Sequence, residues 1–311
     1  MTVQKTFPAL GTVNTLFLRG SDAMETTEEA KAYILSLEQS LSVFRPDSEV
    51  SVLNRQKGGR TVPLREETMR ILEESVRCGE LTEGAFDITA GPLSMIWKKA
   101  IRERRLPDPK EIRKRKRLVG YRELRIDPER GTASLHRTGQ SVDFGGIAKG
   151  WAADRLAELL GKHDIEEALL NLGGTVLVCG GEREIGIRDP FDKAGRIMGT
   201  LKLRNGFAVT SGSYEQGFTA GGIRYHHIID PRTGFPAGSG LCSVTLTGDQ
   251  NAAELDVLAT AAIILGEEKT LPILRERGIE GIFVRDDGQV FVTTGLAERF
   301  RLQPESVKSV S

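Results

Sequence analysis

Apolar residues recur at helical spacing in several stretches of the chain, and strand-like runs lie between them. The periodic stretches predict helices over residues 24–41, 65–79, 148–161, 252–265 and 267–277, and an amphipathic segment over residues 95–100. Asp108, with Glu111 three residues later, is typical of a capping box and predicts a helix from about residue 109. Residues 7–19 have the pattern of a turn and a strand, residues 124–144 that of two strands around a glycine turn, and residues 280–293 that of a strand pair. Further strand-like patterns cover residues 168–179, 184–190, 197–203, 206–210, 223–229 and 241–247. Because strands and helices come in groups and do not alternate strictly, the pattern favours an α+β fold over a doubly wound sheet.

The length of 311 residues allows one large domain or two medium domains. No long linker, low-complexity segment or fixed-period repeat divides the sequence. We therefore expect one domain over residues 1–301, with two closely packed subdomains as the alternative. The polar residues 302–311 are expected to form a frayed tail.

A glycine pair between a predicted strand end and a predicted helix is the first candidate site. Residues 141–144 form the strand end, and Gly145 and Gly146 precede the helix. Such a turn lets backbone N–H groups approach an anion, and Asp143 and Lys149 flank it. The spacing matches neither of the common phosphate-binding motifs, G-x-x-x-x-G-K-[ST] and G-x-G-x-x-G. Two interpretations stay open: a nucleotide or phosphate site, and a plain turn with a solvated lysine.

A second candidate lies in the apolar helix predicted over residues 252–265. Asn251 is a good N-cap, and Glu254 completes a capping box. Asp256 then stands among apolar residues, with Thr260 four positions later on the same face. A carboxylate and a hydroxyl suit a hard cation such as Mg²⁺, whereas an aspartate near a helix N-terminus is also favoured by the helix dipole. The residues alone do not decide between these two interpretations.

A third candidate is the pair His226 and His227, which ends a predicted strand before the turn Asp230-Pro231-Arg232-Thr233-Gly234. Neighbouring strand residues point to opposite faces, so only one of the two imidazoles can face a cleft. That histidine could act as a general base, and a satisfied structural histidine is the alternative.

The charges are balanced overall, with 43 Lys and Arg against 43 Asp and Glu, so bulk charge indicates no nucleic-acid or membrane partner. Residues 98–117 are nevertheless strongly basic, which is typical of a solvated helix face or a docking surface for an acidic partner. Only Trp97 and Tyr121 flank this segment, so base stacking has little support. The three isolated cysteines provide no disulfide framework, zinc spacing or iron–sulfur run.

The N-terminal residues contain neither an apolar signal region nor a lipidation cysteine, and no stretch approaches 18 apolar residues. We therefore expect no membrane segment and a cytoplasmic location. A periplasmic protein whose signal has been removed would have the same sequence.

Taken together, these stretches resemble the ApbE family, the FAD:protein FMN transferases. The matching blocks keep the family's order from Leu10 to Val292, and they cover residues 41–54, 84–93, 143–154, 171–174, 187–190, 210–214, 227–234 and 256–260. The resemblance implies an α+β fold related to a duplicated T-fold, with FAD as donor substrate and Mg²⁺ as cofactor. It also implies transfer of FMN to a Thr or Ser hydroxyl of an acceptor protein while AMP leaves.

The resemblance also implies roles for individual residues. Mg²⁺ would bind Asp256, Thr260, a group at Ala259 and the backbone carbonyl of Gly146. The catalytic residues would be Asp256 and His227, with His227 activating the acceptor hydroxyl. The FAD-binding residues would be Leu10, Phe44, Ala85, Phe86, Asp87, Asp143, Lys149 and Ile229. Leu10 departs from the family pattern, which usually has Met before the first Gly-Thr.

Two other functions remain as alternatives. An FAD pyrophosphatase would use the same residues, with water in place of the protein hydroxyl. A non-catalytic flavin-binding protein would not need Asp256, Thr260 and His227, all of which are present.

Overall fold

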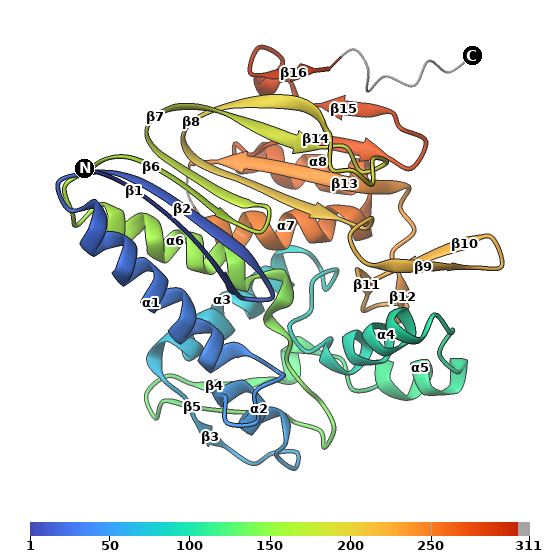
Figure 1. Cartoon of the computed structure of the whole chain (residues 1–311). Helices are drawn as coiled ribbons and strands as arrows, with labels where there is room; N and C mark the ends of the chain where they lie inside the picture. Colours follow the sequence, from blue (N-terminus) through green and yellow to red (C-terminus); the bar gives the residue numbers. More distant parts are fainter. Residues whose placement is uncertain (250, 304–311) are drawn as a thin grey trace. The chain divides into compact units, whose positions relative to one another are not determined.

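Strands from three separate parts of the sequence form the larger sheet of the protein, for which a computed structural model describes residues 1–249 and 251–303 (Figure 1). The chain divides into two units. Unit 1 comprises residues 1–35, 149–214 and 239–311, and unit 2 comprises residues 36–148 and 215–238. The expectation of one domain over residues 1–301 stays a prediction.

Nine strands form a single antiparallel sheet in the described part of unit 1. The order is β1-β2-β6-β7-β8-β13-β14-β15, and β16 also pairs with β8. The strands are β1 (Thr2–Ala9), β2 (Thr12–Gly20), β6 (Ile165–Leu172), β7 (Thr175–Arg188), β8 (Ile197–Gly212), β13 (Leu241–Gly248), β14 (Glu280–Arg285), β15 (Val290–Val292) and β16 (Phe300–Leu302).

Helices α1 (Ala23–Leu41), α6 (Ala148–Leu160), α7 (Ala252–Leu265) and α8 (Glu267–Glu276) accompany this sheet, together with the 3₁₀ turn η3 (Thr294–Leu296). Helix α7 packs against β8 and β13. It is apolar on all sides, and nearly every residue from Ala252 to Ile264 is buried. A helix without a polar face is stable only inside a core, so α7 is the central helix of unit 1.

Unit 2 is mainly helical. It contains α2 (Glu49–Asn54), α3 (Glu66–Leu81), α4 (Gly91–Glu103), α5 (Pro109–Lys116) and the 3₁₀ turns η1 (Tyr121–Glu123) and η2 (Phe144–Gly146). Its short strands are β3 (Val62–Pro63), β4 (Arg125–Asp127), β5 (Thr132–Ser134), β9 (Gly217–Ala220), β10 (Ile223–His226), β11 (Ile229–Asp230) and β12 (Phe235–Pro236). One apolar cluster joins α4 and α5 to the strands that surround His227, with Trp97 near its centre.

The α+β prediction is confirmed, and the helix predicted over residues 252–265 has the predicted bounds. Residues 197–203 and 206–210 were predicted as two strands, but β8 runs through both because Asn205 and Gly206 adopt positive φ angles without ending the strand. Strand β1 was missed because it is an edge strand in which only Phe7 and Ala9 are buried.

The predicted strand end at residues 141–144 is wrong. Ser141 makes one isolated bridge to Ala90, and η2 begins at Phe144, because the Asp143 carboxylate accepts a hydrogen bond from the Gly145 amide. The predicted tail began at Leu302, which instead belongs to β16, and residues 304–311 lie outside the described residues. Among the described residues, no helix combines the length and the hydropathy needed to cross a membrane.

Candidate functional site

Asp256 of α7 carries a buried carboxylate in unit 1, with 2% of the residue's surface exposed. Its Oδ2 accepts a hydrogen bond from the Gly150 amide at 3.1 Å and lies 3.4 Å from Lys149 Nζ. Oδ1 has no hydrogen-bond partner among the residues that the structure describes. Oδ1 is therefore the oxygen of Asp256 that a further ligand can bind.

Thr260 lies one turn after Asp256 on α7, so the two side chains share a face of the helix. Its hydroxyl forms a hydrogen bond of 3.0 Å with the Ser211 hydroxyl at the end of β8. Ala259 is fully buried between them and offers only backbone atoms. Unit 1 thus brings three oxygen-bearing side chains to one side of α7.

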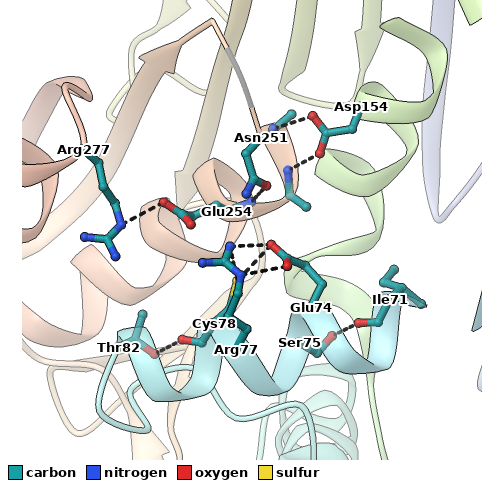
Figure 2. A network of polar contacts seen from close by, with 12 residues as sticks. Ile71, Glu74, Ser75, Arg77, Cys78, Thr82, Asp154, Asn251, Glu254 and Arg277 are labelled. Carbon is teal, nitrogen blue, oxygen red and sulfur yellow. Dashed lines mark hydrogen bonds and ion pairs between the residues drawn. The ribbon is translucent and has the colours of Figure 1, made fainter. Parts of the chain in front are cut away.

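Asp154 holds α7 in place from the neighbouring helix α6. Its two carboxylate oxygens accept hydrogen bonds from the amides of Ala252 and Ala253, at 2.7 and 2.9 Å. The Asn251 side chain caps the same helix end by accepting from the Glu254 amide at 2.9 Å, which confirms that half of the predicted capping box (Figure 2). The Glu254 carboxylate itself binds Arg277 at 3.0 Å.

The residues of unit 1 suit a hard cation only if it takes ligands from elsewhere. Within the described residues, no group of three or more His, Cys, Asp or Glu could hold a metal. Mg²⁺ commonly uses one or two carboxylates together with waters and substrate phosphates. Asp256 and the Thr260 hydroxyl are donors of the right kind, and they fit that pattern.

In unit 2, Asp143 organises the glycine turn. One carboxylate oxygen caps η2 by accepting from the Gly145 amide at 3.0 Å, and the other binds Lys98 Nζ at 2.8 Å. The same ammonium lies 5.7 Å from the centre of the Phe44 ring, of which 82% is exposed. An exposed aromatic ring beside an ion pair is an unusual surface feature that suits a planar ligand.

The Ala85-Phe86-Asp87 segment is buried in unit 2. Both Asp87 oxygens already accept hydrogen bonds, one from Thr89 at 2.8 and 2.6 Å and the other from the Tyr121 amide at 3.0 Å. Burial raises the pKa of Asp87, although these hydrogen bonds oppose the shift. In the described contacts Asp87 shapes the loop, and its contact with a cofactor stays a prediction.

The two histidines differ as their strand positions predict. His226 is buried: its Nε2 donates to the Ala237 carbonyl at 3.0 Å, and its Nδ1 accepts from the Ile228 amide at 3.3 Å. Burial lowers its pKa, so this ring is a neutral structural group. The partly exposed His227 has Nδ1 3.4 Å from the Gln216 carbonyl. A proton on Nδ1 makes Nε2 the basic nitrogen.

The last two predicted residues, Ile229 and Leu10, are apolar and take no part in the hydrogen bonds described above. Ile229 is buried in the apolar cluster of unit 2 with Leu93 and Trp97. Leu10 and Gly11 form the two-residue turn between β1 and β2 in unit 1, and both have positive φ angles.

The predicted residues therefore fall into two groups. Unit 1 holds Leu10, Lys149, Asp256, Ala259 and Thr260, and unit 2 holds Phe44, Ala85, Phe86, Asp87, Asp143, Gly146, His227 and Ile229. Sequence reasoning missed Lys98 as a partner of Asp143, the Gly150 amide and Ser211. Only Ser211 had a signal, because the sequence around it, residues 210–214, is rich in hydroxyl side chains, although the structure places Ser211 in β8 and not in a loop.

Comparison with known proteins supports the resemblance. Residues 10–283 match the model of the ApbE family. A relative from Treponema pallidum, named FAD:protein FMN transferase, is 33% identical over 294 residues, which cover 88% of this chain and 81% of the relative. A relative of the same name from Klebsiella pneumoniae is 33% identical over 268 residues, which cover 86% of this chain and 84% of the relative.

Solved structures give the same result for the fold. The ApbE protein from Thermotoga maritima superposes with a TM-score of 0.87 at 27% identity, over 97% of this chain and 100% of that protein. The flavin transferase ApbE from Vibrio cholerae superposes with a TM-score of 0.80 at 26% identity, over 96% of this chain and 99% of that protein. The family match, the identity to curated relatives and the fold agree, and the chain belongs to the ApbE family.

Proposed function

We propose that this protein transfers FMN from FAD to a Thr or Ser hydroxyl of an acceptor protein and releases AMP. The proposal is supported by its membership of the ApbE family and by relatives named FAD:protein FMN transferase at 33% identity. The observation that carries it is Asp256, a buried carboxylate whose Oδ2 is held by the Gly150 amide and whose Oδ1 accepts no hydrogen bond in the described part of the chain. In the reaction the acceptor oxygen bonds to the FMN phosphorus, and the bond from that phosphorus to the oxygen of AMP breaks.

Mg²⁺ would be held by Asp256, Thr260 and the backbone at Gly146 and Ala259. When bound, it would neutralise charge on the pyrophosphate of FAD. Lys149 adds a second positive charge beside Asp256. The Gly150 amide keeps the carboxylate in one orientation, since it donates to Oδ2.

His227 would take the proton of the acceptor hydroxyl as its oxygen attacks phosphorus. The contact of Nδ1 with the Gln216 carbonyl supports this role because it favours the tautomer in which Nε2 is unprotonated. Buried His226 already uses both ring nitrogens and is not proposed as the base. Protonated His227 could then return its proton to solvent after AMP leaves.

The exposed Phe44 ring would stack on the flavin, and Lys98 and Asp143 would bind polar groups of FAD. An isoalloxazine ring is large and planar, so an aromatic side chain with 82% of its surface exposed suits it. Binding of FAD by Ala85, Phe86, Asp87, Ile229 and Leu10 stays a prediction. The cytoplasmic location also stays a prediction.

The test is incubation with FAD and Mg²⁺, with and without an acceptor domain that carries an Asp-x-Thr/Ser-Gly-Ala-Thr/Ser site. AMP release and the mass of the acceptor are followed together. We expect the acceptor to gain one FMN, and we expect Asp256→Ala and His227→Ala to abolish the gain. His226→Gln is the matched histidine control, and it should retain transfer.

Other results would assign a different function. AMP and free FMN formed at the same rate with or without the acceptor would indicate an FAD pyrophosphatase. FAD that binds and stays intact in both incubations would indicate a flavin-binding protein and would refute the transferase proposal.

A further inference from the structure

The basic segment, residues 98–117, concentrates positive charge in a protein that is otherwise acidic. It contains eleven Lys or Arg and three Asp or Glu, whereas the whole chain contains 43 of each class. The rest of the chain therefore has eight more acidic than basic residues. Such an uneven distribution creates a local positive potential, which attracts an oppositely charged partner.

Most of these basic side chains have no counter-ion within residues 1–249 and 251–303. Among the described residues, three of the eleven form ion pairs, namely Lys98 with Asp143, Arg102 with Glu103 and Arg115 with Glu111. The other eight are exposed and have no carboxylate partner in the described part of the chain. A solvated helix face commonly mixes both signs of charge, so this surface is unusual.

The basic segment is fixed to the same core as the chain around His227. Ile112, the one large apolar residue of α5, is buried in a cluster with Trp97 of α4. The Trp97 indole N–H donates to the Gly234 carbonyl at 2.9 Å, and its ring stacks on Tyr225 with centroids 5.7 Å apart. Tyr225 and Gly234 flank His227 in sequence. The basic side chains thus project from a frame that also supports the candidate base.

Three exposed apolar side chains accompany the charges. Met95 of α4 is 60% exposed, Leu106 of the basic segment is 45% exposed and Phe235 of β12 is 44% exposed. Phe235 also packs edge-on against Trp97, with centroids 6.0 Å apart. Exposed apolar side chains next to a charged surface are typical of sites that bind another polypeptide.

The same surface is poorly suited to nucleic acid or to a membrane. The aromatic residues at its ends, Trp97 and Tyr121, are buried and cannot stack on bases. A helix that lies in a membrane surface needs an exposed apolar face, whereas Ile112 of α5 is buried. The chemistry that remains is an acidic stretch of protein.

We propose that the basic segment is the docking surface for an acidic stretch of the acceptor protein. This inference rests on the proposed transferase function and specifies the chemistry of its protein substrate. Charges at the edge of an interface mainly raise the association rate, so docking should affect the KM for the acceptor more than kcat.

The test compares two triple variants. One reverses charge in the basic segment, Arg113→Glu with Lys114→Glu and Lys116→Glu. The control reverses three exposed basic residues of unit 1, Lys162→Glu with Lys193→Glu and Arg301→Glu, and changes the net charge equally. The acceptor domain is used in two forms, with Glu or with Gln around the target hydroxyl. A third variant with Gln at residues 113, 114 and 116 covers the case in which the Glu variant fails to fold.

We expect the segment variants to raise the KM for the Glu-flanked acceptor by about tenfold or more, and the control to leave it within about twofold. Raising NaCl from about 50 to 300 mM should remove most of the difference. The Kd for FAD should be the same in all proteins. Equal KM values for segment and control variants overturn the inference, as does equal use of the Glu and Gln acceptors.

Competition experiments separate the other possible partners. Displacement of the Glu-flanked acceptor by a polyglutamate peptide supports the inference. Displacement only by RNA or by phosphatidylserine vesicles overturns it. If the wild-type protein transfers no FMN to either acceptor, the proposed function fails, whereas normal transfer with unaltered KM values refutes only the docking surface.

Discussion

The Gly150 amide and the Asp256 carboxylate are 106 positions apart in sequence, yet they form a hydrogen bond of 3.1 Å. This bond ties the first turn of α6 to the buried face of α7. Lys149, the residue before Gly150, lies 3.4 Å from the same Oδ2. Two neighbours on α6 therefore bind one oxygen of Asp256 and orient the other, Oδ1.

Gly150→Ala should separate α6 from α7. A Cβ at this position would overlap the Ala252 carbonyl oxygen and would lie 2.7 Å from the Ala253 Cα, and backbone atoms cannot move aside cheaply. We expect a loss of about 1–3 kcal/mol in the free energy of unfolding, measured by urea denaturation. Weaker Mg²⁺ binding should accompany it, because the orientation of Asp256 depends on this contact.

Gly161→Ala is the matched control, because Gly161 directly follows the same helix. A Cβ there would meet its nearest neighbour, the Glu158 carbonyl, at 3.6 Å, which is an ordinary contact. We expect it to be neutral or slightly stabilising. Equal effects of the two substitutions would show that Gly150 has no special packing role.

Mg²⁺ should stabilise the protein through Asp256. With FAD present, Mg²⁺ at about 100 times its Kd should add roughly 2.7 kcal/mol to the free energy of unfolding, since it binds only the folded state. Calorimetry should show a Tm increase that EDTA removes. Asp256→Asn should abolish the increase because the neutral amide is a poor ligand for Mg²⁺.

Lys149→Met tests whether the adjacent cation has a different role. The substitution keeps much of the apolar stem and removes only the charge that faces Asp256 and the proposed pyrophosphate. The Mg²⁺-dependent Tm increase should persist, whereas the Kd for FAD should rise by about tenfold, measured by flavin fluorescence. An unchanged Kd would exclude Lys149 from the FAD site.

Local signals in the sequence predicted the elements well where they were strong. The bounds of α7 follow from a continuous apolar run, the N-cap Asn251 and the terminal Gly266. The isolated Asp256 in that run was also a strong signal, because a charge is costly in a core. Strand β1 had no comparable signal, since most of its residues are partly or fully exposed.

Contacts between distant segments could not be predicted in the same way. Lys98 belongs to a basic run and gave no sign that it would bind Asp143, 45 residues away. Asp143 looked like the end of a strand, but its side chain accepts from the Gly145 amide and starts a 3₁₀ turn. Side-chain capping competes with strand pairing, and the sequence pattern alone does not decide which prevails.

Asp154→Ala should destabilise α7 and loosen the candidate metal ligands. The carboxylate accepts hydrogen bonds from the first two amides of that helix, and its charge is favoured by the helix dipole. We expect a loss of about 1–2 kcal/mol in unfolding free energy. Asp154 is a positioning residue, so the Kd for Mg²⁺ should rise together with the loss of stability.

Asp154→Asn distinguishes the helix cap from a nonspecific loss of packing. The amide keeps one acceptor oxygen and a similar shape. Compared with Asp154→Ala, we therefore expect Asp154→Asn to recover about half of the lost unfolding free energy and most of the lost Mg²⁺ affinity. Equal losses in the Ala and Asn variants would indicate that the negative charge, and not the hydrogen bonds, is essential.

His226 should make the protein sensitive to mild acid. Burial lowers its pKa below the ordinary value of 6.5, so the unfolded chain binds a proton at a pH where the folded chain does not. Stability rises with pH wherever the unfolded state binds more protons. The contribution of His226 is therefore complete above pH 6.5 and decreases as the pH falls toward the lowered pKa, by at most about 1.4 kcal/mol per pH unit.

The measurement is urea denaturation of the wild type and of His226→Gln at several pH values between about 7.5 and 5. Gln cannot titrate, so the free-energy difference between the two proteins should shrink as the pH falls. His136→Gln is a matched control, because it removes an exposed histidine by the same substitution. A difference for His226→Gln that stays constant would mean that the imidazole has the same pKa in the folded and unfolded states. In that case the hydrogen bond that Nε2 donates to the Ala237 carbonyl at 3.0 Å would fully offset the effect of burial on the pKa.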